Sequence, residues 1–187
     1  MWILCKTFSI LIILFSVFSG CSVHPNTFSK KDLEKYGVRR VAVIPFYNNT
    51  TAKTAGKVVT NCFIEELLNS KDIEVEFPGN VRKLLVEERI ITRKGIGSGQ
   101  IKLIGKRLNV DAVVLGRVTE YGGDDASGSP VVSVNARMVH TDTSSILWMG
   151  QNKRTGDDYI KVFDIGRIDS APKLARNVVR ELILMID

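Results

Sequence analysis

The chain has 187 residues, of which 44% are hydrophobic and 25% charged, a composition typical of one globular domain or at most two. It excludes a disordered or collagen-like chain, and a mean hydropathy of +0.06 excludes a polytopic membrane protein. The net charge of +6 gives no warrant for nucleic-acid binding, which usually requires basic residues clustered on one face. Three cysteines are too few for a disulfide-rich scaffold.

The first twenty residues have the features of a signal peptide. Lys6 precedes an uncharged apolar block at residues 8–18, which is shorter than the roughly 20 residues that a membrane-spanning helix needs. We therefore predict a signal peptide over residues 1–20. Phe18-Ser19-Gly20-Cys21 resembles the lipobox of bacterial lipoproteins, although Phe18 stands where that family usually has leucine.

The lipobox resemblance implies that Cys21 becomes the lipid-bearing N-terminus of the mature protein. Ser22, in place of an aspartate, implies retention at the outer membrane rather than the inner membrane. The alternative is an ordinary secretory signal followed by an unrelated cysteine. We predict that residues 21–37 form this acylated N-terminus and a flexible tether, because residues 22–36 are polar and show no sustained period. Fully extended, residues 22–36 could reach about 50 Å.

Residues 38–187 are predicted to form the periplasmic domain. Apolar runs at 38–46 and 112–121 are typical of strands covered on both faces. The alternation at 73–77 predicts a strand with one solvent-exposed face. Two further strands, at 131–139 and 146–154, are predicted to form a hairpin.

Helical periodicity and capping residues predict four helices. They run from Thr51 or Thr54 to Asn69, over a short segment after Pro78-Gly79, from Ser98 to Asn109, and from about Ala171 to Met185. The predicted order of elements is β-α-β-α-α-β-β-β-α. We therefore predict one α/β domain, with a mixed sheet of about five strands flanked by helices.

Motifs that could carry chemistry are weak. The glycine-rich segment 95–99 follows Arg93 and Lys94, but it lacks the spacing of known phosphate-binding loops, which favours a connector. His140 with Asp142 is predicted to be part of a hairpin turn, and Cys62 a buried, inert thiol in a helical stripe. We predict no catalytic residue, metal site or cofactor.

Trp148 and Met149 are the candidate contact residues. They lie in the apolar segment Ile146-Leu147-Trp148-Met149 near the hairpin turn. A large apolar side chain with a polar tip suits a contact with lipid headgroups or with another subunit, whereas a position in the core is equally compatible with the sequence.

Three segments carry a family resemblance. Val41-Ala42-Val43-Ile44-Pro45-Phe46, Val110 to Val118, and the hairpin from Val134 to Trp148 resemble, in this order, the periplasmic lipoproteins that include the curli secretion lipoprotein CsgG, the penicillin-binding-protein activator LpoB and the Pel polysaccharide export lipoprotein PelC. The similarity extends over residues 38–186. Thr143-Ser144-Ser145 replaces the Thr-Gly-Glu that members usually carry, and the loops are too short for membrane-inserting hairpins.

The resemblance implies a non-enzymatic lipoprotein on the periplasmic face of the outer membrane. The compact members imply a homo-oligomeric ring that assists polysaccharide or protein export, in which a tryptophan of the hairpin region faces the membrane. The main alternative is a monomeric activator of a peptidoglycan synthase. An enzyme acting on envelope polysaccharide is a third possibility, but the sequence shows no sign of its carboxylate pair.

Overall fold

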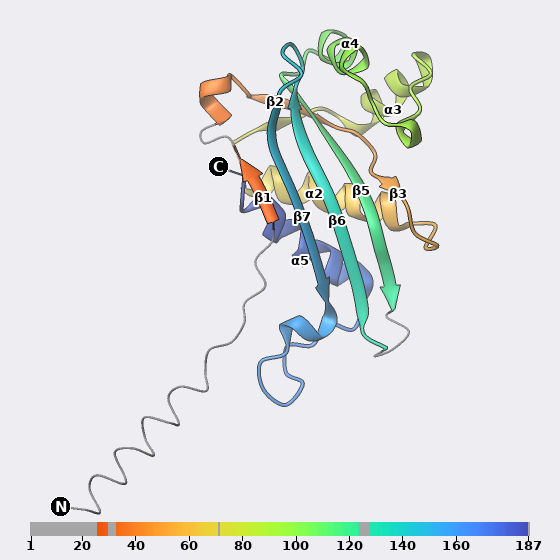
Figure 1. Cartoon of the computed structure of the whole chain (residues 1–187), viewed down its shortest axis with the longest axis vertical. Helices are drawn as coiled ribbons and strands as arrows, with labels where there is room; N and C mark the ends of the chain where they lie inside the picture. Colours follow the sequence, from red (N-terminus) through yellow and green to blue (C-terminus); the bar gives the residue numbers. More distant parts are fainter. Residues whose placement is uncertain (1–25, 30–32, 71, 124–127, 187) are drawn as a thin grey trace, which may run out of the picture.

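The structure is a computed structural model that describes residues 26–29, 33–70, 72–123 and 128–186. Seven strands form one mixed sheet in the order β1-β7-β6-β5-β2-β4, with β3 pairing with β5 beside this row (Figure 1). The strands are β1 (Asn26–Ser29), β2 (Arg40–Val43), β3 (Tyr47–Asn48), β4 (Glu74–Val75), β5 (Ala112–Gly123), β6 (Pro130–His140) and β7 (Ile146–Thr155). The predicted α/β class and mixed sheet are confirmed, and the two extra strands are β1 and β3.

Helices cover the sheet on both faces. They are α2 (Ala55–Ser70), α3 (Pro78–Glu87), α4 (Ser98–Leu108) and α5 (Ala171–Ile183). Because side chains alternate along a strand, Val114 of β5 packs into the core beneath α2 and α5, whereas Val113 packs beneath α3 and α4. In Figure 1, α3 and α4 lie at the end of the sheet where β5 begins. The rest of that face carries no helix, and no described helix is long and apolar enough to span a membrane.

The larger core is built around aromatic rings. Phe63 of α2 lies 5.2 Å from Phe46 and 6.4 Å from Trp148, measured between ring centroids. Gly116 makes this packing possible, because a Cβ atom at that position would lie 2.3 Å from the Phe46 ring. Glycine at position 116 thus allows the Phe46 ring to pack directly against the sheet.

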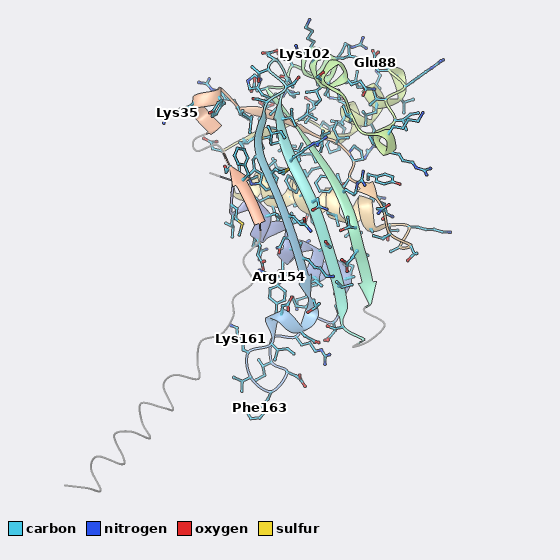
Figure 2. The ribbon with its side chains drawn as sticks, in the orientation of Figure 1. Lys35, Glu88, Lys102, Arg154, Lys161 and Phe163 are labelled. Carbon is cyan, nitrogen blue, oxygen red and sulfur yellow. The ribbon has the colours of Figure 1, made fainter. Side chains whose placement is uncertain are left out.

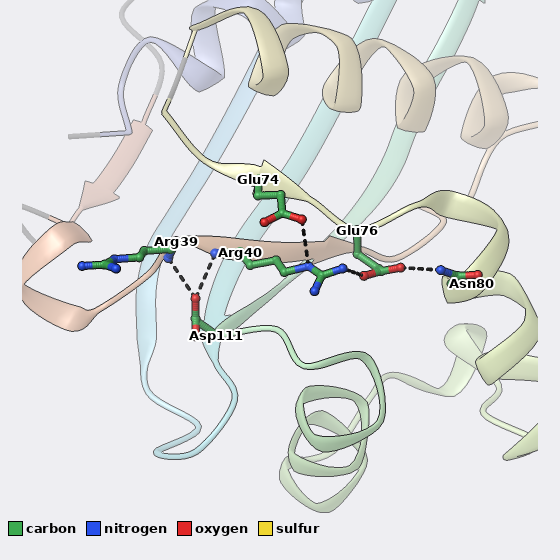
Figure 3. Close-up of polar contacts among 6 residues, drawn as sticks. All are labelled: Arg39, Arg40, Glu74, Glu76, Asn80 and Asp111. Carbon is green, nitrogen blue, oxygen red and sulfur yellow. Dashed lines mark hydrogen bonds and ion pairs between the residues drawn. The ribbon is translucent and has the colours of Figure 1, made fainter.

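A polar cluster fixes the edge of the sheet where β2 meets β4 (Figure 3). The Asp111 carboxylate accepts hydrogen bonds of 2.9 Å from the backbone N–H groups of both Arg39 and Arg40. The Arg40 guanidinium forms an ion pair with Glu76, whose side chain is only 3% exposed, and Asn80 donates a further hydrogen bond to Glu76. The cluster therefore ties β2, the segment after β4, and α3 together.

Replacing Arg40 by methionine should lower the free energy of unfolding by about 2–3 kcal/mol, because it leaves the Glu76 carboxylate buried without its cation. Because Arg40 is partly exposed, this loss is smaller than that expected for a fully buried ion pair. Urea denaturation measures this loss. Adding Glu76→Leu should recover more than half of it, and Arg82→Met, at an exposed position of α3, is the matched control. Equal stability of Arg40→Met and the control would contradict the structural role of the ion pair.

The tether predicted over residues 21–37 is partly wrong. Asn26–Ser29 forms strand β1, which pairs antiparallel with β7, and Leu33–Tyr36 forms a short 3-10 helix. Backbone hydrogen bonding to the edge strand β7 supplies the order that the polar composition did not reveal. Residues 1–25, including the predicted signal peptide and Cys21, lie outside the described residues.

Candidate functional site

Trp148 lies in the core of the chain, so the predicted contact of its side chain with membrane or partner is wrong. Its exposure is 0%, and it packs against Phe63 of α2. A bulge between β6 and β7 contributes to this placement, because it puts both Leu147 and Trp148 into the core. Among the described residues the indole Nε1 has no hydrogen-bond partner, so apolar packing alone holds the side chain in place.

Met149 points to the other face of the sheet and is exposed. It pairs in register with Phe28 of β1 on one side and with Arg137 of β6 on the other. Phe28 is also half exposed, so the two side chains form an apolar patch at the edge of the helix-free face. A contact through Met149 stays a prediction.

Strand β1 runs away from the end of the sheet at which β7 finishes. It is antiparallel to β7, and its first residue, Asn26, lies opposite Gln151, four residues before the end of β7 at Thr155. Cys21 precedes Asn26 by five residues, which span at most about 17 Å when extended. A lipid on Cys21 would therefore hold the start of β1 within about this distance of the bilayer.

The same end carries an exposed apolar loop, residues 160–168, between β7 and α5 (Figure 1). Phe163 is 93% exposed and Ile165 68% exposed, and Val162 is also exposed. Figure 2 shows Phe163 at the outermost point of this loop, pointing away from the sheet, with Lys161 beside it on the same loop. We call Val162, Phe163 and Ile165 the apolar tip.

The backbone of the apolar tip forms a tight hairpin. Val162 and Ile165 form an antiparallel bridge, and the two residues between them have positive φ angles, 47° at Phe163 and 62° at Asp164. This is the left-handed region, which favours glycine and is rare for a bulky side chain. The turn therefore presents Phe163 to solvent at a conformational cost.

A hydrogen-bond network fixes the base of the loop to α5. The Glu181 carboxylate accepts hydrogen bonds from Asn152 (2.9 Å), from Arg154 (2.9 Å) and from the hydroxyl of Tyr159 (2.7 Å). Burial, followed by the bond to Glu181, raises the pKa of Tyr159 above its ordinary value, so the phenol keeps its proton as a donor. Arg167 closes the loop through an ion pair of 2.9 Å with Asp157.

Cys62 and His140, which the sequence also singled out, take part in local packing and hydrogen bonding. Cys62 is buried, and burial is the main cause that raises the pKa of its thiol, as expected for an inert group. His140 accepts a hydrogen bond from the backbone N–H of Asp142 within the hairpin turn. Within the described ranges, no three His, Cys, Asp or Glu side chains are grouped as a metal site would require.

The sequence reasoning missed the apolar tip. Its signal is the run Tyr159-Ile160-Lys161-Val162-Phe163, in which apolar residues continue beyond the last strand into a segment that ends at Gly166. An apolar loop segment of this kind is as compatible with burial under a helix as with exposure. Only the fold reveals that the segment projects from the end of the sheet.

Comparison with solved structures identifies proteins of the same architecture. No protein-family model matches the chain, and no curated protein sequence matches it. The dodecameric PelC from Paraburkholderia phytofirmans superimposes with a TM-score of 0.61 over 87% of this chain and 97% of PelC, at 16% sequence identity. This chain has the PelC fold.

Two other similar structures are lipoproteins or parts of them. The lipoprotein GNA1162 from Neisseria meningitidis has a TM-score of 0.53 at 17% identity, over 64% of this chain and 85% of GNA1162. The C-terminal domain of LpoB from Salmonella enterica reaches 0.47 at 13% identity, over 62% and 82% of the two chains. The predicted resemblance to PelC is thus confirmed at the level of the fold, and the resemblance to CsgG stays a prediction.

Proposed function

We propose that the protein is a non-enzymatic lipoprotein, anchored through acylated Cys21 to the periplasmic face of the outer membrane, and that it assembles into a ring that assists export of a polysaccharide or protein. The proposed membrane anchoring is supported by the direction of β1 and the position of the apolar tip. β1 begins opposite Gln151 and runs away from the Thr155 end of β7, the end from which the apolar tip projects. One orientation on a bilayer therefore satisfies both.

The apolar tip has the chemistry of a membrane contact. Burying a phenylalanine side chain in an apolar environment contributes about 1.5–3 kcal/mol, and Val162 and Ile165 add to this area. Lys161 is exposed on the same loop, and its ammonium group can bind lipid phosphates. The tip alone would bind a bilayer weakly, so its role is to orient a domain that the lipid already holds.

The strained turn supports this role. A left-handed conformation costs about 1–2 kcal/mol at Phe163, and glycine would relieve it, whereas aspartate, as at position 164, adopts this region more readily. Strain of this kind is found where the presented side chain has a use. Here the turn holds a phenylalanine outward, against the preference of the side chain for burial.

The ring is proposed from the fold shared with PelC, which is a dodecamer. Native mass spectrometry of the lipidated protein, released from detergent micelles, tests the assembly. We expect one closed oligomer of high order. Phe163→Ser should leave the number of subunits unchanged because the tip faces lipid. A monomer at every concentration would contradict the ring and would favour the monomeric activator of a peptidoglycan synthase.

A further inference from the structure

The helix-free face of the sheet contains a cavity of about 420 Å³. Residues from β3, β5, β6 and β7 line it, together with Ile44 and Pro45 between β2 and β3 and the connection before α4. Its volume lies within the range of sites that bind small ligands or peptide side chains. None of the features assigned above to membrane anchoring contributes to it, apart from Met149 at its edge.

Two arginines contribute to the lining of this cavity. Arg117 of β5 and Arg137 of β6 are diagonal neighbours, because Leu115 pairs with Arg137 and Arg117 pairs with Asn135. Long side chains in this relation can reach the same bound group. Both arginines are exposed, and in the described part of the chain neither has a carboxylate partner, whereas six of the twelve described arginines have one.

Arg117 is held ready for a ligand. Its guanidinium carbon lies 5.2 Å from the centre of the Tyr47 ring, as a cation–π contact requires. Stacking on the ring restrains the side chain but leaves the N–H donors free to bind a planar acceptor. A carboxylate matches the fork of a guanidinium because it accepts two parallel hydrogen bonds.

The rest of the lining is mainly aliphatic. Ile44, Leu115 and Met149 contribute apolar surface, and the exposed Phe28 continues it toward the edge strand. The glycine-rich segment that the sequence singled out also lies here, with Gly95 and the buried Ile96 in the lining. The segment caps α4 through a hydrogen bond from the Gly97 N–H to Gln100, so it forms a wall of the cavity and does not cradle a phosphate.

We propose that this cavity binds an extended peptide segment of a partner protein in which acidic side chains alternate with aliphatic ones. The arginines would bind the carboxylates, and the aliphatic side chains would cover Leu115 and Met149. A sugar would use aromatic stacking platforms, whereas the one aromatic ring of this lining, Tyr47, already carries Arg117. Since the cavity lies within one chain, the proposal does not depend on the ring.

Fluorescence anisotropy tests the proposal with a labelled peptide, Gly-Leu-Glu-Leu-Glu-Leu-Gly, and the lipidated protein in nanodiscs, with empty nanodiscs as the blank. Replacing both glutamates of the peptide by glutamine should weaken binding at least about tenfold, because each exchange removes charge-assisted hydrogen bonds. Arg117→Gln with Arg137→Gln should weaken binding of the acidic peptide by a similar factor. Arg82→Gln, on α3 outside the cavity, should leave it unchanged.

Three outcomes would overturn the proposal. They are no saturable binding of the acidic peptide, equal binding of the glutamine peptide, and undiminished binding after the double arginine exchange. Hexanoate, as a competitor, distinguishes a peptide from a free carboxylic acid: it should displace the peptide only at far higher concentration, and equal potency would contradict a peptide site. Both arginines are exposed, so thermal unfolding of the double variant should match the wild type and confirm that it folds.

Discussion

Replacing Trp148 by alanine should lower the free energy of unfolding by about 3–5 kcal/mol. The side chain is fully buried and in ring contact with Phe63, so its removal leaves a cavity between the sheet and α2. Chemical denaturation of the lipidated protein in detergent measures the loss. Membrane association of the folded fraction should be unchanged, because no atom of this side chain reaches the surface.

Trp148→Phe is the matched control. It keeps a six-membered aromatic ring in the core and removes the pyrrole part of the indole, including the N–H group that has no hydrogen-bond partner among the described residues. We expect a loss of less than about 1.5 kcal/mol, as for other nearly conservative core exchanges. If Trp148→Ala left stability unchanged and released the protein from the membrane, the position of the indole in the core would be wrong.

The second large effect concerns Cys21. Exchange of Cys21 for serine should abolish incorporation of radioactive palmitate completely. In the lipoproteins whose lipobox this segment resembles, the sulfur atom of this cysteine carries the lipid. The same variant should accumulate as a precursor that keeps residues 1–20. Labelling of growing cells, followed by mass spectrometry of the purified chain, measures both results.

Cys62→Ser is the internal control for this experiment. Cys62 is a buried residue of α2, and its raised pKa reduces the thiolate fraction, so it should accept no lipid. The Cys62→Ser chain should therefore carry as much palmitate as the wild type. Palmitate that persists in Cys21→Ser, or a mature chain that begins elsewhere, would contradict the lipoprotein assignment.

The order of strands and helices could be predicted because each element has a strong local pattern. Strand β5 begins with the apolar run Ala112-Val113-Val114-Leu115, and α5 combines Pro172 in its first turn with an apolar stripe. Strands β1 and β3 could not be predicted in this way. Asn26–Ser29 is polar and Tyr47–Asn48 is two residues long, so their pairing depends on the neighbouring strands β7 and β5.

The surface sites were harder to predict than the fold. The segment Leu147-Trp148-Met149 contains two buried residues and one exposed residue, and only the bulge opposite Val139 decides which side chain faces which way. Arg117 and Arg137 are 20 positions apart in the sequence and meet only through the register of β5 and β6. A period-2 pattern reveals that both are exposed but not that they share a cavity.

The orientation of the domain on the bilayer is tested most directly by a tryptophan at position 163. Phe163→Trp, as a lipidated protein in vesicles of brominated phospholipid, should show fluorescence that is strongly quenched, after subtraction of the contribution of Trp148. Phe77→Trp is the control, because Phe77 is exposed and lies at the other end of the sheet. It follows β4 directly, and β4 pairs with β2 beside the start of β5. Our account predicts quenching at position 163 and none at position 77. Unquenched fluorescence at position 163, accessible to iodide in the water, would contradict it.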